Sequence, residues 1–159
     1  MKNELSEKLG YALEIIFPNE PSEEFIQWFQ NIESKSFREN LCYTRNEILD
    51  RWMKENSLIF FLVKTQDPIA VLLGYNLSVE SLNFFYLDTL AVIPEGKGIG
   101  STIIRTLIKW ASALSYAGIK LDTERDSERG KHLLVFYEKL GFKFIEEDNT
   151  GDIILEYRF

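Results

Sequence analysis

The chain has 159 residues and a formal net charge of −7, because 25 aspartate and glutamate residues outnumber 18 lysine and arginine residues. Apolar residues make up 45% and aromatic residues 14%, which is enough for a hydrophobic core and excludes wholesale disorder. The length favours a single domain over residues 1–159. The acidic balance argues against a nucleic-acid partner, which would need a basic face. It is compatible with a cationic substrate or with solubility alone.

Cys42 is the only cysteine, so neither an intrachain disulfide nor a multi-cysteine zinc site can form, and a reducing compartment fits. Its apolar neighbours predict a small buried side chain rather than a nucleophile. Residues 1–10 are polar and are expected to be frayed or weakly helical. The longest apolar runs, residues 58–63 and 69–73, are too short to span a bilayer. We therefore expect a cytoplasmic protein without a membrane partner.

The first half of the chain predicts a strand, two helices and a pair of strands. Residues 11–17 are apolar and stop at Pro18, which is typical of a strand. Residues 22–37 carry apolar side chains at helical spacing, with Ser22 as the N-cap. Thr44 and Glu47 form a capping box that starts the second helix. Residues 58–64 and 69–78 predict antiparallel strands joined by a turn at 66–68, with a looser connection over 76–81.

The second half predicts a parallel crossover and a closing pair of strands. Residues 82–93 form the longest strand candidate, and an amphipathic helix follows, for which Gly118 is the predicted C-terminal cap. A strand over 119–124 then implies a right-handed parallel crossover. Residues 127–140 predict the last helix, capped by Gly141, before strands over 142–145 and 152–159. The fold class is therefore α+β: a mixed, largely antiparallel sheet with one parallel βαβ crossover and helices on both faces.

A glycine-rich loop over residues 95–100 lies between the longest strand and the amphipathic helix. The first amides of a helix lack internal partners and that end is positive, so such a loop favours a phosphate or diphosphate. The P-loop string is absent, and Ser101 stands where a dinucleotide fingerprint needs its third glycine. A plain turn with a helix cap remains the alternative.

Two motifs resemble the GNAT (Gcn5-related N-acetyltransferase) family. The family's loop, Gln/Arg-x-x-Gly-x-Gly/Ala after a Leu-x-Val-like strand end, is similar to residues 90–92 followed by 95–100. The family's helix ending in Tyr-x-x-x-Gly-Phe is matched by residues 137–142. The opening Gln or Arg of the loop is Glu95 here, with Lys97 two residues on.

The resemblance implies acetyl-CoA as the donor and an amine as the acceptor. It assigns the diphosphate to the main-chain amides of the glycine loop and the start of the helix, and the pantetheine arm to the main chain of the preceding strand. Phe136, beside the motif tyrosine, is counted with these cofactor-binding residues. The full set is Leu90, Ala91, Val92, Lys97, Gly98, Ile99, Gly100, Ser101 and Phe136.

Direct transfer needs a base for the amine, a donor for the thioester oxygen and a proton for the leaving thiolate. The resemblance assigns the last task to Tyr137, for which a packed core tyrosine is the alternative, and the oxyanion to the amide of Ala91 or Val92. Tyr86, Asp88 and Glu124 are the candidate bases, with Glu33 as a further carboxylate. Asp122 is interpreted as part of an exposed acidic face. The single histidine, His132, is expected at the surface, and no metal site is expected.

The sequence therefore predicts an N-acetyltransferase acting on a primary amine of a small molecule or peptide. A catalytically weak acyl-CoA-binding module and an unrelated nucleotide-binding protein are the alternatives. The expected oligomeric state is a monomer or homodimer.

Overall fold

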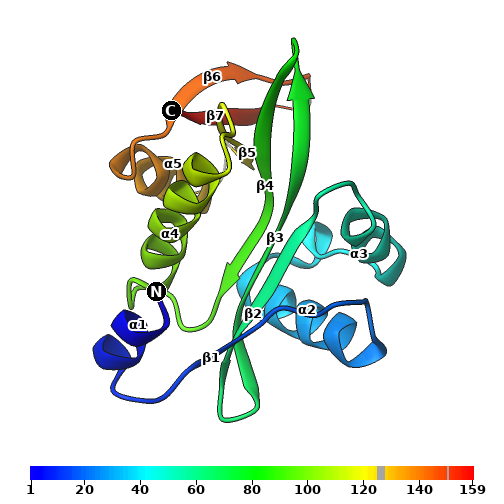
Figure 1. The fold of residues 1–159 in the computed structure, drawn as a ribbon, viewed down its shortest axis with the longest axis vertical. Coiled ribbons are helices and arrows are strands. Elements are labelled where there is room, and N and C mark those ends of the chain that lie inside the picture. The colour runs from blue at the N-terminus through cyan, green and yellow to red at the C-terminus, as the bar shows by residue number, and fades with distance from the viewer. Residues whose placement is uncertain (125–127, 150) are drawn as a thin grey trace. The chain divides into compact units, whose positions relative to one another are not determined.

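The computed structural model describes residues 1–124, 128–149 and 151–159. These residues form one seven-stranded mixed sheet in the order β1-β2-β3-β4-β5-β7-β6 (Figure 1). The strands β4 and β5 pair in parallel, whereas β1 with β2, β2 with β3, β5 with β7, and β6 with β7 are antiparallel. The elements are α1 (Lys2–Leu9), β1 (Glu14–Ile16), α2 (Glu23–Ser36), the 3-10 helix η1 (Glu39–Leu41), α3 (Arg45–Trp52), β2 (Leu58–Lys64), β3 (Asp67–Val79), β4 (Leu82–Val92), α4 (Ile99–Ala113), β5 (Gly118–Glu124), α5 (Glu128–Lys139), β6 (Lys143–Glu147) and β7 (Asp152–Arg158). The predicted α+β class is confirmed.

The chain divides into two compact units. Unit 1 contains Met1–Tyr75 and Thr89–Ile103, and unit 2 contains Asn76–Asp88 and Ile104–Phe159. The elements β3, β4 and α4 each contribute residues to both units. The single domain expected over residues 1–159 stays a prediction.

The core of unit 1 is formed by the inner faces of α2 and α3 with β2 and β3. Phe61 of β2 is fully buried, and it stacks on Phe25 with ring centroids 5.7 Å apart and meets the edge of Trp28 at 5.6 Å. Such aromatic pairs add about 0.5–1.5 kcal/mol beyond the burial of their area. The helical stripe predicted over residues 22–37 is therefore the face that packs on the sheet.

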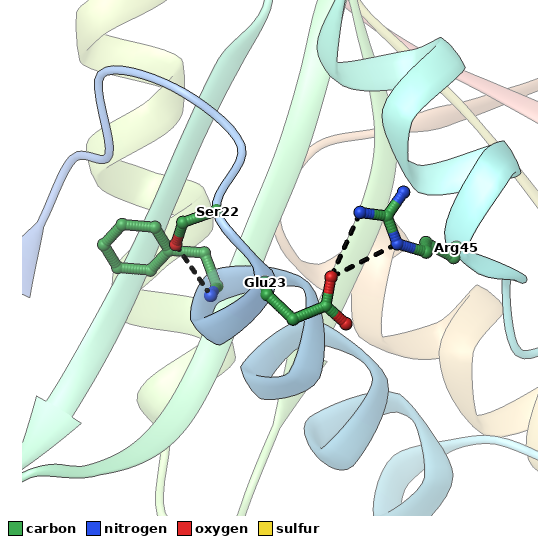
Figure 2. Close-up of polar contacts among 4 residues, drawn as sticks. Ser22, Glu23 and Arg45 are labelled. Atoms are coloured by element: carbon green, nitrogen blue, oxygen red, sulfur yellow. Dashed lines mark hydrogen bonds and ion pairs between the residues drawn. The ribbon is translucent and has the colours of Figure 1, made fainter.

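Both predicted helix caps of unit 1 are present. The Ser22 hydroxyl accepts a hydrogen bond from the Phe25 amide at 3.3 Å, and the Glu23 carboxylate binds the Arg45 guanidinium across the two helices at 3.0 Å (Figure 2). In α3 the Thr44 hydroxyl accepts from the Glu47 amide at 3.4 Å, and the Glu47 carboxylate accepts from the Thr44 amide at 2.8 Å. Hydrogen bonds from Thr44 lower the pKa of Glu47. Each cap satisfies main-chain donors that would otherwise lack partners.

Two loop predictions are wrong because hairpins use left-handed residues other than glycine. The connection expected over residues 76–81 is mostly strand: β3 continues to Val79, and only Glu80 and Ser81 turn, with φ of 49° and 68°. The turn placed at residues 66–68 lies one position earlier, at Thr65 and Gln66, with φ of 46° and 69°. Two successive residues with positive φ are typical of the tight hairpin turn that matches strand twist.

The predicted helix cap at Gly118 is wrong. This position requires glycine because neighbouring atoms leave no room for a Cβ. It is the first residue of β5, and the positive φ after α4 belongs to Ser115, at 61°. A Cβ on Gly118 would collide with the Tyr157 carbonyl oxygen and would lie 3.2 Å from Phe84 Cε1. The predicted C-terminal cap at Gly141 is confirmed by its φ of 97°.

The N-terminal residues, expected to be frayed or weakly helical, form the two-turn helix α1. Its Leu5 is fully buried, and Gly10 ends the helix in the left-handed conformation with φ of 75°. None of the helices in the described part of the chain combines the length and the apolar character that a membrane span requires.

Thr44→Ala is expected to lower the free energy of unfolding by about 1 kcal/mol, because it removes the capping hydroxyl. Urea denaturation followed by tryptophan fluorescence, to which Trp28 of α2 and Trp52 of α3 contribute, would measure this change. The matched variant Thr44→Ser keeps the hydroxyl and is expected to stay within about 0.5 kcal/mol of the wild type. Equal losses in the two variants would contradict the role of the cap.

Candidate active site

The glycine loop joins β4 to α4 within unit 1. Gly96 and Gly98 have φ of 76° and 75°, a backbone conformation that residues with a Cβ rarely adopt. The Gly98 carbonyl accepts from the Thr102 amide at 3.2 Å and from the Ser101 hydroxyl at 3.0 Å, so the helix begins here. The three amides after Gly98 therefore lie in the first turn, where a helix supplies no acceptor for them. Such amides bind anions.

The side chains of the glycine loop differ in exposure. Lys97 is exposed, whereas Ile99 is 1% exposed and packs into the core. Gly100 and Ser101 are half-buried. The residues predicted to bind the diphosphate therefore lie at the start of a helix, as the sequence indicated. Their binding of a diphosphate stays a prediction.

The residues predicted to pair with the pantetheine arm form the last part of β4, also in unit 1. Ala91 is buried in the core beside α2 and α3, and Leu90 and Val92 are half-buried. The next residue, Ile93, donates its amide to the Ile69 carbonyl at 2.7 Å, which fixes the end of the strand. The predicted pairing of these three residues with the pantetheine arm stays a prediction, and so does the binding of the oxyanion by the amide of Ala91 or Val92.

In unit 2, the side chains of Tyr86 and Asp122 form a direct pair. The Tyr86 hydroxyl donates a hydrogen bond to the Asp122 carboxylate at 2.8 Å. Tyr86 of β4 stands opposite Lys120 of β5 in the parallel register, and Asp122 follows two residues later on the same face. That register covers Phe84–Tyr86 with Gly118–Lys120, so the pair lies where the described pairing of β4 with β5 stops.

The pKa of Asp122 is raised, mainly by partial desolvation. The hydrogen bond from Tyr86 lowers this pKa, while the negative charges of Asp148, Asp152 and Asp88 raise it. Asp148 is itself fixed in the turn between β6 and β7, where its carboxylate accepts from the Asp152 amide at 3.0 Å. A carboxylate with a raised pKa is a stronger base than an ordinary surface aspartate. Asp122 is therefore a candidate base, in surroundings that favour a cation.

Sequence reasoning named Tyr86 and placed Asp122 on an exposed acidic face. Asp122 is exposed, as expected, but its hydrogen bond with Tyr86 was not foreseen. The missed signal is the alternation of residues 119–124, which puts Asp122 on the polar face of its strand. The register between β4 and β5 was also needed, because it brings that face beside Tyr86. Of the other predicted bases, Asp88 is half-buried and acts on Asp122 through its charge. Glu124 is the last residue of β5, and its side chain lies outside the described part of the structure.

Tyr137 projects from α5 into an aromatic cluster of unit 2. Its side chain is 8% exposed, and its ring meets the edges of Phe136 at 5.0 Å and Phe142 at 5.4 Å. Burial raises the pKa of Tyr137 well above its ordinary range. The hydroxyl therefore stays protonated at neutral pH and is available as a hydrogen-bond donor. Phe136 is half-buried, and its contact with a cofactor stays a prediction.

Three further residues from the sequence analysis have structural or surface positions. Glu33 is buried and its carboxylate accepts from the Tyr43 amide at 2.9 Å, which ties α2 to the segment before α3. Cys42 was predicted to be buried and is instead half-exposed, and burial with the charges of Glu33 and Glu39 raises the pKa of its thiol. His132 is exposed, as predicted. Within the described residues, no cluster of three or more histidine, cysteine or acidic side chains could hold a metal ion.

A family model described as the acetyltransferase (GNAT) family matches residues 14–142. The chain belongs to the GNAT family. The match includes the glycine loop, the Tyr86–Asp122 pair and Tyr137, so the resemblance predicted from the two motifs is confirmed. A comparison with curated protein sequences found no significant match.

Solved structures of acetyltransferases share the fold. The ribosomal-protein-S18-alanine N-acetyltransferase from Escherichia coli is 17% identical, with 92% of this chain and 94% of that chain covered and a TM-score of 0.69. Arabidopsis thaliana NAA60, solved with acetyl-CoA, is 13% identical, with 92% and 100% covered and a TM-score of 0.70. Arabidopsis thaliana Naa50, solved with the bisubstrate analogue CoA-Ac-MVNAL, is 15% identical, with 92% and 99% covered and a TM-score of 0.67. At these identities the likeness shows the fold.

Asp122→Asn is expected to raise the thermal stability of this GNAT chain at neutral pH. A carboxyl whose pKa is raised by folding binds its proton more tightly in the folded state, so its stabilising contribution is greatest at low pH and is lost as pH rises through the folded pKa. The amide removes the cost of the ionised form and keeps an acceptor for Tyr86. Melting temperatures measured from about pH 4 to pH 7 should therefore fall for the wild type relative to the variant.

Asp50→Asn, at an exposed position of α3, is the matched control for the loss of one carboxylate. It is expected to show a smaller change with pH than Asp122→Asn. If the two variants follow the same curve, Asp122 is an ordinary surface carboxylate.

Proposed function

We propose that this GNAT chain transfers an acetyl group from acetyl-CoA directly to a primary amine of a small molecule or peptide. The observation that carries the proposal is the start of α4, where two left-handed glycines precede a first helical turn whose amides have no acceptor within the helix, an arrangement suited to an anion. Acetyl-CoA supplies a thioester as the activated acyl donor. Two relatives of this fold are solved with acetyl-CoA or with a CoA analogue, which supports the same donor here.

The glycine loop fits the diphosphate of such a donor. A Cβ on Gly98 would collide with the Lys8 side chain in front of the loop, and an exposed Lys97 adds a positive charge beside it. The positive end of the helix dipole and the unpaired amides act on the same anion. The residues present therefore suit the group, and Lys97, Gly98, Ile99, Gly100 and Ser101 would hold it through their main chain.

The base in this proposal is Asp122, held by Tyr86. A primary alkylamine is mostly protonated at neutral pH and must lose a proton before it can attack a thioester. Because the pKa of Asp122 is raised, the difference in pKa between its carboxyl group and an alkylammonium is smaller than for an ordinary aspartate. The hydroxyl of Tyr86 orients the carboxylate by the hydrogen bond at 2.8 Å.

The acceptor in this proposal carries a positive charge. Asp88, Asp148 and Asp152 all act on Asp122 as negative charges, so an ammonium near Asp122 would be attracted before it is deprotonated. The Escherichia coli relative acts on the alanine of a ribosomal protein, and a peptide amine is one member of the class proposed here. The cytoplasmic location and the monomeric or dimeric state stay predictions.

Tyr137 serves as a hydrogen-bond donor to the leaving thiolate rather than as a full acid. A thiol has an ordinary pKa of about 8.5, and a phenol about 10. Because burial raises the pKa of Tyr137 further, complete proton transfer to a thiolate is unfavourable, whereas donation of a hydrogen bond stabilises the charge that develops on sulfur.

The test is release of free thiol when the protein is incubated with acetyl-CoA and a panel of amines, followed by mass spectrometry of the acetylated product. The proposal predicts thiol release that depends on the amine, with Asp122→Asn lowered roughly a hundredfold in kcat/KM. Binding of CoA without release for any amine would favour the catalytically weak acyl-CoA-binding module. A preference for nucleotides over CoA would contradict both readings.

Tyr137→Phe is expected to lower kcat roughly tenfold or more, because the donor to the developing thiolate is lost while the buried ring remains. The dissociation constant for CoA should change less than about twofold. Steady-state kinetics and calorimetry measure these two quantities. Phe136→Leu is the neighbouring control, for which affinity rather than turnover should change. A large loss of CoA affinity in Tyr137→Phe would contradict the donor role.

A further inference from the structure

Helix α1 is fixed within unit 1 by a buried side chain and a hydrogen bond. Leu5 has no exposed surface, and the Ser6 hydroxyl accepts from the Leu13 amide at 3.2 Å. Gly10 then ends the helix in the left-handed conformation. These contacts hold the main chain of α1, so the lysine at position 8, one turn beyond Leu5, projects from a defined place.

The side chain of Lys8 reaches over the glycine loop. Its Cε lies 3.1 Å from the position that a Cβ on Gly98 would take, and its Nζ lies closer still, in the space that a Cβ would fill. Ser101 Oγ is 3.7 Å from the same position. Figure 1 shows α1 beside the start of α4, in agreement with this contact. Gly98 therefore supplies the left-handed turn and also the room for the Lys8 ammonium.

The charge of the loop itself is balanced without Lys8. Glu95 and Lys97 are both exposed and carry opposite charges, so the side chains of residues 95–100 sum to zero. A diphosphate in a diester linkage carries about two negative charges, which main-chain amides solvate but do not neutralise. An ammonium is a donor only, so it cannot bind to these amides and is suited to an anion that the amides also hold.

We propose that Lys8 is a further ligand of the donor's diphosphate, recruited to the glycine loop from a helix that precedes the first strand. The inference rests on the proposed function and deepens it. Lys8 supplies the positive charge that Glu95 takes away from this loop. The family model begins at residue 14, so the contribution comes from outside the matched region.

Calorimetric titration with CoA, dephospho-CoA and pantetheine tests this assignment in Lys8→Gln. The variant is expected to bind CoA and dephospho-CoA roughly threefold to tenfold more weakly than the wild type, between the effect of an exposed ion pair and that of a charged hydrogen bond. Pantetheine, which lacks the diphosphate, should bind equally to both. Raising the salt concentration should shrink the difference for CoA, because an exposed charge pair is screened.

Lys2→Gln, in the same helix and also exposed, controls for the loss of one positive charge and should stay within about twofold of the wild type. Lys8→Arg should retain most of the affinity. Equal binding by Lys8→Gln and Lys2→Gln would overturn the assignment, and so would a loss seen with CoA but not with dephospho-CoA, which would place Lys8 at the 3′-phosphate. Tighter binding by Lys8→Gln would also overturn it. If the folded wild type binds no CoA at all, the proposed function itself fails.

Discussion

The amides at the start of α4 are the constraint on which the rest of this molecule's proposed chemistry depends. They belong to the main chain, so their charge distribution is set by the helix and not by the identity of neighbouring side chains. Two glycines with φ near 75° keep the main chain open on one side, and the buried Ile99 anchors the first turn to the core. Because the donors are fixed before any anion arrives, little reorganisation accompanies binding. Glu95, in place of the glutamine or arginine that opens the family's loop, therefore leaves these main-chain donors where they are.

Glu95 still adds a negative charge to the glycine loop. In the proposed assignment, Lys8 of α1 supplies the positive charge that offsets it. A charge that is lost from a loop can be replaced by one that is distant in sequence, provided that a rigid element carries it. The buried Leu5 supplies that rigidity at a segment whose composition is otherwise polar. The polar composition of residues 1–10 is thus a poor guide to their order, since one buried leucine and a glycine cap are enough to fix two helical turns within unit 1.

Local patterns predicted most of the elements, because the signals are carried by neighbouring residues. Ser22 and the Thr44–Glu47 box act within one turn, so their spacing in the sequence is their spacing in the structure. Gly118 was misread because its reason is non-local: the Tyr157 carbonyl that excludes a Cβ belongs to the last strand. The Tyr86–Asp122 pair was missed for the same cause, since it joins residues 36 positions apart in the chain and depends on the register of β4 with β5. The family motifs added what periodicity does not contain, namely the chemistry expected at the loop and at Tyr137.

Desolvation raises the pKa of both Asp122 and Tyr137 in unit 2, with opposite consequences for proton transfer. For Asp122 it raises the pKa and makes the carboxylate a better proton acceptor, whereas for Tyr137 it raises the pKa and makes the phenol a poorer acid. In the proposed function a single physical effect therefore separates the roles: Asp122 is a more basic acceptor for the ammonium proton than an ordinary aspartate, and the charge on the leaving thiolate meets a hydrogen-bond donor at Tyr137 that keeps its own proton. In the proposed reaction the acceptor nitrogen gives up two protons. One passes through the partly solvated Asp122 carboxylate to solvent, and the other neutralises the thiolate, so that CoA leaves as a thiol while Tyr137 keeps its own proton. The acidic surroundings of Asp122 then favour the cationic form of the acceptor before the reaction and lose that attraction once the amide, which is neutral, has formed.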